Sequence, residues 1–136
     1  MRLRIALCGL VLCVGLAPVL VAQDAAKVDA AHYTVISDNA RVRILKAHYG
    51  PHEKSVMHSH PDAVAVFLTD ANARFTYPDG KTEDFTVKAG DARYTPHTVH
   101  MPENLGDKDM EVIVIELKPH MAKPMATKMS DDSMKK

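Results

Sequence analysis

The chain has 136 residues, which suits one domain of ordinary size but not two. Lys and Arg together number 17, as do Asp and Glu, so the formal net charge is zero. This balance argues against a basic nucleic-acid-binding protein or a polybasic membrane-surface protein. Hydrophobic residues make up 46% of the chain, too many for a disordered protein. We therefore expect one globular domain that does not have a nucleic acid as its partner.

The first 22 residues have the layout of a secretory signal peptide. Arg2 and Arg4 give a positive start, residues 5–21 contain no charged side chain, and Ala22 precedes a polar stretch. Cleavage after Ala22 predicts a periplasmic or secreted protein with no membrane attachment once the signal is removed. An uncleaved anchor is the alternative, because the apolar run is at the short limit for a membrane span. Both cysteines lie in this segment, so the mature chain would have no disulfide or thiolate site.

The body of the chain has the pattern of successive short strands. Residues 23–32 are polar and Ala-rich, and we expect them to be a flexible lead-in. Beyond them, turn signals recur without helical periodicity between them, and Asp79-Gly80 between two alternating segments predicts a β-hairpin. Runs of strand length lie at residues 41–46, 63–68, 74–77, 82–87 and 111–117. Residues 63–68 are apolar throughout, which favours burial on both faces. The pattern predicts an all-β sandwich or barrel over residues 33–118.

Residues 119–136 form a polar tail that we expect to be mobile, because Pro119 and Pro124 interrupt any continuation of the last strand. The tail contains His120 and the methionines Met121, Met125, Met129 and Met134. Thioethers bind soft Cu(I), so copper handling in the periplasm is one interpretation of this tail. The alternatives are that the methionines form one face of a short helix, or that they have no role.

Histidine is the unusual component of the sequence, and four of the eight histidines fall in two tight pairs. His58 and His60 are two residues apart, so on a strand they point to the same face. His97 and His100 are three apart and point to opposite faces, so only one of them can easily join the first pair. Three imidazoles that converge inside a barrel bind a divalent transition metal and leave positions for water or substrate. The alternative is that the His-x-His pair is merely exposed.

Around these pairs the chain resembles the cupin superfamily. The first cupin motif runs from Gly through His-x-His, and it is matched here by Gly50, His58 and His60. The second motif runs from Gly through Pro and His to Asn, and it is matched by Gly90, Pro96, His100 and Asn104. The resemblance covers residues 33–118 and implies a small jelly-roll β-barrel with His58, His60 and His100 as metal ligands. Because cupins often pair through their sheets, it also implies a candidate homodimer.

The chain departs from the cupin pattern at one ligand position. The metal-binding Glu of the family should fall at Val64 or Ala65, and neither side chain can bind a metal. Three neutral imidazoles leave a bound divalent metal with its full charge, which favours an anionic substrate or hydroxide as the next ligand. The loss of one ligand in four would also weaken metal binding. The sequence does not choose among Fe, Zn, Mn, Ni and Cu.

The sequence leaves open whether the protein is an enzyme. The first hypothesis is an exported, single-domain cupin whose metal supports dioxygenase-type or isomerase-type chemistry on a small oxygenated or anionic molecule. His97 is then a candidate proton shuttle at the barrel mouth, because imidazole titrates near neutral pH; the alternative is an exposed turn histidine. The second hypothesis is a non-enzymatic module that stores or senses a metal or a small ligand.

Overall fold

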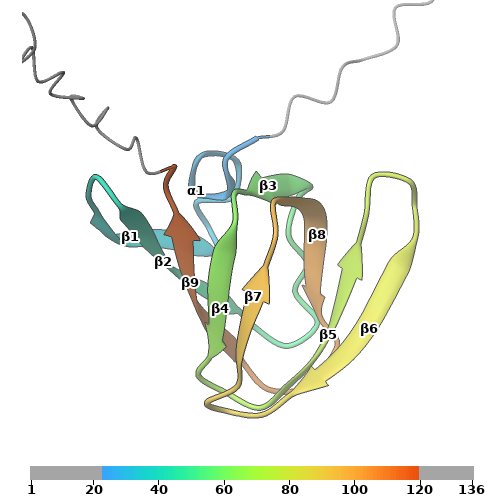
Figure 1. Cartoon of the computed structure of the whole chain (residues 1–136). Helices are drawn as coiled ribbons and strands as arrows, with labels where there is room; N and C mark the ends of the chain where they lie inside the picture. Colours follow the sequence, from blue (N-terminus) through green and yellow to red (C-terminus); the bar gives the residue numbers. More distant parts are fainter. Residues whose placement is uncertain (1–22, 120–136) are drawn as a thin grey trace, which may run out of the picture.

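Two antiparallel β-sheets face each other across a shared interior (Figure 1). The structure is a computed structural model that describes residues 23–119. One sheet has five strands in the order β1-β2-β9-β4-β7, and the other has four in the order β3-β8-β5-β6. The elements are α1 (Ala25–Val28), β1 (Tyr33–Asp38), β2 (Val42–Tyr49), β3 (His58–His60), β4 (Ala63–Phe67), β5 (Ala71–Thr76), β6 (Thr82–Val87), β7 (Ala92–Thr95), β8 (Thr98–Asn104) and β9 (Met110–Leu117). The predicted all-β fold is confirmed.

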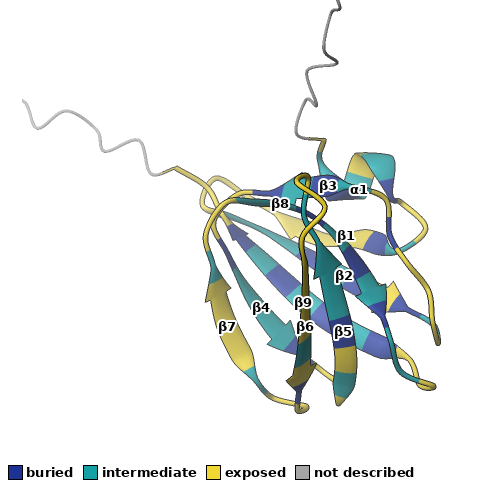
Figure 2. Ribbon diagram, turned by 90° about the vertical axis from the view of Figure 1, so that its right-hand side faces the viewer, coloured by how far each residue is buried: buried dark blue, intermediate teal, exposed yellow. Residues whose placement is uncertain are grey.

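Alternating side chains on the central strands build the interior. On β9, Met110, Val112 and Val114 are buried and their neighbours are only half-buried. On the adjoining β2, Leu45 and Ala47 are buried and pair in register with Val114 and Val112. Burial of one such large aliphatic side chain contributes roughly 1.5–3 kcal/mol to stability. Figure 2 shows this alternation along the strands, and it shows β7 mostly exposed at one edge of its sheet.

The predicted hairpin is confirmed. β5 and β6 pair from Ala71↔Val87 to Thr76↔Thr82, and Gly80 lies in the connecting turn with φ +81°, a conformation that favours glycine. The expectation that residues 63–68 are buried on both faces is wrong. Ala63 and Phe67 are buried, but the three residues between them in β4 are half-buried. The reason is that β4 belongs to an antiparallel sheet, which covers one face with the interior and leaves the other partly open to solvent.

The segment that we expected to be a flexible lead-in is packed against the barrel. It contains α1, whose first turn is capped by the Asp24 side chain, and Ala25 is fully buried. The carbonyl of Gln23 accepts a hydrogen bond from the Ser59 amide at 2.7 Å, so the segment is joined to β3. Figure 1 shows α1 beside β3. Polar contacts and the burial of Ala25 in the hydrophobic core together hold this segment in place.

Two predicted segments lie outside the described residues. These are the signal peptide at residues 1–22 and the tail from residue 120 onwards, and both stay predictions. Within residues 23–119, no helix is long and apolar enough to cross a membrane.

Candidate metal centre

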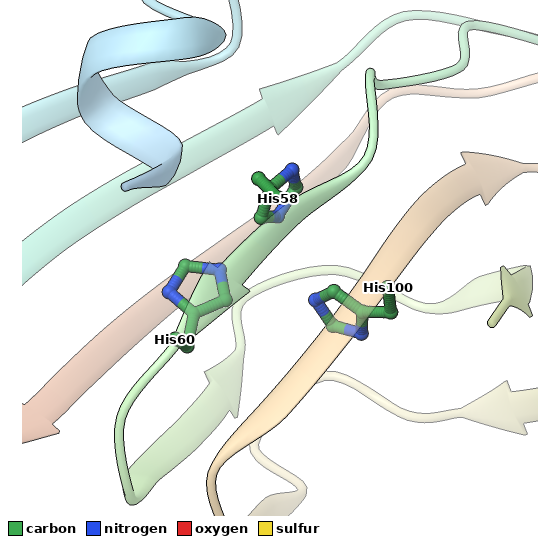
Figure 3. Close-up of side chains that lie close together, drawn as sticks. All are labelled: His58, His60 and His100. Carbon is green, nitrogen blue, oxygen red and sulfur yellow. The ribbon is translucent and has the colours of Figure 1, made fainter. Parts of the chain in front are cut away.

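Three histidines meet on the inner face of the four-stranded sheet (Figure 3). His58 and His60 lie on β3, and His100 lies opposite His58 on the neighbouring β8. One nitrogen from each ring lies within 4.8 Å of the other two, which is close enough for a single metal ion to join them. All three side chains are buried, with 1%, 4% and 6% of their surfaces exposed.

The period of a β-strand explains why these histidines converge. His58 and His60 are separated by one residue, so both face the interior while Ser59 faces away. On β8 the alternation buries His100 together with Pro102 and Asn104. The prediction that His58, His60 and His100 lie together is therefore what the structure shows; that they bind a metal is a separate question.

His58 is held through its Nδ1 atom. This nitrogen lies 2.8 Å from the carbonyl oxygen of Val56 and 3.0 Å from the Ser55 hydroxyl, which in turn donates to the Asp29 carboxylate. Because a carbonyl only accepts, Nδ1 carries the proton and Nε2 keeps its lone pair. The Tyr33 hydroxyl lies 3.1 Å from Nε2. Burial, and then the neighbouring His60, lower the pKa of His58 to about 4.

His60 is held by a chain of charged groups. Its Nδ1 donates to Oε1 of Glu116 at 2.8 Å, and Nε of Arg43 donates to Oε2 of the same carboxylate at 2.5 Å. Arg43 also donates to Asp24 at 2.6 Å, so the chain ends in the N-terminal segment. Burial alone would raise the pKa of Glu116, but the hydrogen bonds from His60 and Arg43 outweigh it and lower that pKa. The ionised carboxylate fixes the proton of His60 on Nδ1 and leaves the lone pair of Nε2 free to bind a metal.

His100 has no such support. Both of its ring nitrogens are buried and without a hydrogen-bond partner in the described part of the chain. Its closest aromatic neighbour is Phe75, whose ring centre is 4.3 Å from that of His100. Burial, followed by the charges that His60 and His58 would carry, lowers the pKa of His100 to about 3. A buried polar group left unpaired costs roughly 1–3 kcal/mol, so this site has a lone pair that a metal would satisfy.

The cluster borders an apolar cavity of about 60 Å³. Tyr33, His60 and His100 form part of its wall. A second cavity of about 280 Å³, which includes Arg93 and His97, lies next to the first. The two cavities share the wall residues Ala65, Phe67, Phe75, Phe85, Thr95 and Thr98. We call them the inner and the outer cavity, and the outer one leads from the histidines towards solvent.

The other residues singled out from sequence lie outside the cluster. His97 precedes β8, is exposed, and lines the outer cavity; its backbone amide donates to Asp62 at 2.8 Å. Val64 and Ala65, where the family's carboxylate would fall, lie on β4, and Ala65 lines both cavities. The carboxylate brought to the histidines is instead Glu116, which contacts the Nδ1 side of His60.

Sequence reasoning missed Tyr33 and Glu116. Glu116 continues the inward-facing series of Val112 and Val114 on β9, so a carboxylate in phase with buried residues was the available signal. Tyr33 gave no signal, because a single aromatic residue at the start of a strand is ordinary.

Residues 45–116 match the family model described as a cupin domain. The chain belongs to the cupin superfamily. It is similar to the crystal structure of a cupin domain from Bordetella pertussis Tohama I, with 27% sequence identity and a TM-score of 0.60 over 64% of this chain and 92% of that one. It is also similar to a Klebsiella pneumoniae protein with a double-stranded β-helix domain, at 19% identity and a TM-score of 0.52 over 62% and 74% of the two chains. This second likeness concerns the fold alone. No curated protein matches this cupin significantly in sequence.

Proposed function

We propose that this cupin binds a divalent transition metal through His58, His60 and His100 and uses it to act on a small anionic or oxygenated molecule. The observation that carries the proposal is His100, whose two ring nitrogens are buried without a hydrogen-bond partner in the described residues. One of these nitrogens lies within 4.8 Å of a nitrogen of each of the two further imidazoles. The lone pair of His100 is costly to bury without a ligand that accepts it.

The donor set fits a metal ion. His58 and His60 both keep their protons on Nδ1, so their Nε2 lone pairs are the ones available to the metal. Three protein ligands leave coordination positions open, which is the pattern of catalytic rather than structural sites. When bound, such a metal supplies a Lewis acid that polarises an oxygen of the substrate. Imidazole ligands suit several transition metals, so the identity of the ion stays open.

The surrounding residues favour an oxygen-bearing substrate. The inner cavity is mostly apolar, and this excludes water from the neighbourhood of the histidines. The Tyr33 hydroxyl lies in its wall beside His58 and accepts a hydrogen bond from Tyr49 at 2.9 Å. In the structure the Tyr33 hydroxyl, which accepts from Tyr49, has its own proton left for Nε2 of His58. When a metal takes that lone pair, the Tyr33 proton becomes available to an acceptor oxygen in the cavity. Three neutral ligands leave the charge of the metal for an anionic substrate to balance.

A non-enzymatic binding module is the second candidate. The observation in its favour is the small inner cavity, whose wall is mostly apolar. The two candidates differ in turnover. A protein that binds metal tightly but converts no member of a broad panel of small carboxylates and oxygenated molecules would be a binding module.

Elemental analysis of the protein, purified without affinity tag or chelator, tests the metal site. We expect about one equivalent of a transition metal in the wild type, loss of that metal in His58→Ala and His100→Ala, and retention in His97→Ala. His97→Ala is the matched control, because His97 is exposed and outside the cluster. Circular dichroism of each variant separates loss of a ligand from loss of the fold. Equal metal content in all three folded variants would overturn the assignment.

Export is part of the proposal, since it follows from the signal-like first 22 residues. N-terminal sequencing of the protein recovered from the producing cells tests it. We expect Gln23 as the first residue, and an intact Met1 in the cytoplasmic fraction would contradict export. The homodimer stays a prediction.

A further inference from the structure

Arg93 has an unusual position at the wall of the outer cavity. It lies on β7, two residues before Thr95, and Thr95 lines both cavities. Residues two apart on a strand share a face, so Arg93 lies on the cavity-lining face of this edge strand, where its side chain is exposed to solvent. Its guanidinium lies 5.6 Å from the centre of the Phe85 ring. One nitrogen donates to the carbonyl of Thr86 at 3.3 Å, which joins β7 to β6, the edge strand of the other sheet.

The charge of Arg93 is not neutralised by a protein carboxylate. Arg43 pairs with Glu116 and Asp24, and Arg74 pairs with Asp84, but no ion pair involves Arg93 within residues 23–119. Glu83 lines the same cavity, yet its carboxylate accepts from the Tyr77 hydroxyl at 2.7 Å instead. The guanidinium has five N–H donors and uses one of them on Thr86, so most of its donors remain for a ligand.

Aromatic rings connect Arg93 to the histidine cluster. The Phe75 ring is centred 4.3 Å from that of His100 and 4.7 Å from that of Phe85, and Phe85 in turn lies under Arg93. The rings form one wall of the joined cavities. A molecule that spans them would therefore have a cation at the outer end, an apolar surface along its length, and the three histidines at the inner end.

We propose that the cavity selects a carboxylate on an apolar body, with Arg93 as the residue that binds the carboxylate. This inference rests on the proposed function, because it names the substrate class of the same site. A planar carboxylate matches the fork of a guanidinium with two parallel hydrogen bonds, and the Phe85 face below keeps that fork oriented. The apolar wall of Phe75 and Phe85 favours an aliphatic or aromatic body over a sugar or a nucleotide.

Isothermal titration of metal-loaded protein tests the proposal with three probes of similar shape: phenylacetate, its neutral amide phenylacetamide, and phenyl phosphate. We expect phenylacetate to bind about tenfold more tightly than the amide, which is the gain from one charge-assisted contact. Arg93→Met should abolish this preference, and Arg93→Lys should keep part of it. Arg74→Met is the matched control, because Arg74 is paired on the outer surface of β5 and should leave the preference unchanged.

Three outcomes would overturn the proposal. The first is equal binding of the acid and the amide by the wild type, and the second is an unchanged preference in Arg93→Met. The third is tighter binding of phenyl phosphate than of phenylacetate. The same titrations with metal-free protein separate this inference from the metal site. If the protein takes up no metal, the proposed function fails, while an acid preference that depends on Arg93 still supports the carboxylate site.

Discussion

The two strands that carry the histidines hold them in different ways. On β3, His58 and His60 each have Nδ1 in a hydrogen bond, to the Val56 carbonyl and to Glu116. On β8, His100 has no hydrogen bond within the described residues and is held by packing against Phe75. The β3 side is therefore oriented by polar partners, and the β8 side by shape alone. His58 and His60 are therefore oriented before a metal binds, whereas the buried, unpaired nitrogens of His100 lower the stability of the fold. The rest of the barrel has to offset that free-energy cost.

The sharpest test of this difference replaces each histidine by leucine. His100→Leu should abolish metal binding and also stabilise the metal-free protein by about 1–2 kcal/mol, because two unpaired nitrogens are replaced by apolar atoms. His58→Leu should also abolish metal binding, but it should destabilise the protein, since Ser55 and the Val56 carbonyl lose their partner. Urea unfolding in the presence of a chelator measures both effects. Equal destabilisation by the two variants would show that the two sides of the site do not differ.

Acid should lower the stability of the metal-free protein. The pKa values of His58 and His100 are lowered to about 4 and about 3, first by burial and then by neighbouring imidazoles, whereas an imidazole in the unfolded chain titrates near pH 6.5. Below pH 6.5 the unfolded state binds protons that the folded state does not. Stability is therefore full above pH 6.5 and falls as the pH drops towards 4, by on the order of 2–4 kcal/mol at about pH 5.

Urea unfolding at a series of pH values measures this dependence. His100→Leu should flatten it, because one of the two titrating groups is gone. His97→Ala, which changes an exposed side chain, should leave the curve as it is. If His100→Leu loses as much stability on acidification as the wild type, the burial of His100 does not cause the acid sensitivity of the fold.

The smallest expected effect concerns the support of His60. Glu116→Gln should weaken metal binding about 10–100-fold, the range found when a carboxylate partner of a ligating histidine is lost. Glu111→Gln is the matched control on the same strand, because Glu111 pairs with Lys46 at the surface. Asp24→Asn should act in the same direction and more weakly, since Asp24 reaches His60 only through Arg43 and Glu116. Competition with a chromophoric chelator measures these metal affinities. Identical affinities for Glu111→Gln and Glu116→Gln would show that the hydrogen bond from His60 to Glu116 does not strengthen metal binding.

Much of the fold and the histidine cluster was accessible from sequence, because both depend on local patterns. The period of two placed His58 beside His60, and the spacing of the second cupin motif selected His100 over His97. The supporting groups were not accessible. The alternating pattern of residues 41–46 predicts only that Arg43 is a polar position on a strand. Its pairing with Glu116 depends on the register between β2 and β9, which the sequence does not indicate. The docking of the segment that contains α1 was missed for the same reason, because its contacts, such as that of Gln23 with Ser59, join residues distant in sequence.

The charged chain from Asp24 through Arg43 and Glu116 to His60 also has a consequence for the order of folding. Its links join residues that are 19, 73 and 56 positions apart, so the two links to Glu116 each require the closure of a long loop. Of the three clustered histidines, an unfolded chain keeps only His58 and His60 close together, and a two-ligand site retains ions weakly. The complete site exists only once β2, β3, β8 and β9 have assembled. In the proposed function, metal capture would then be the closing event of folding and not its template, unlike in small domains that a metal ion organises from the start.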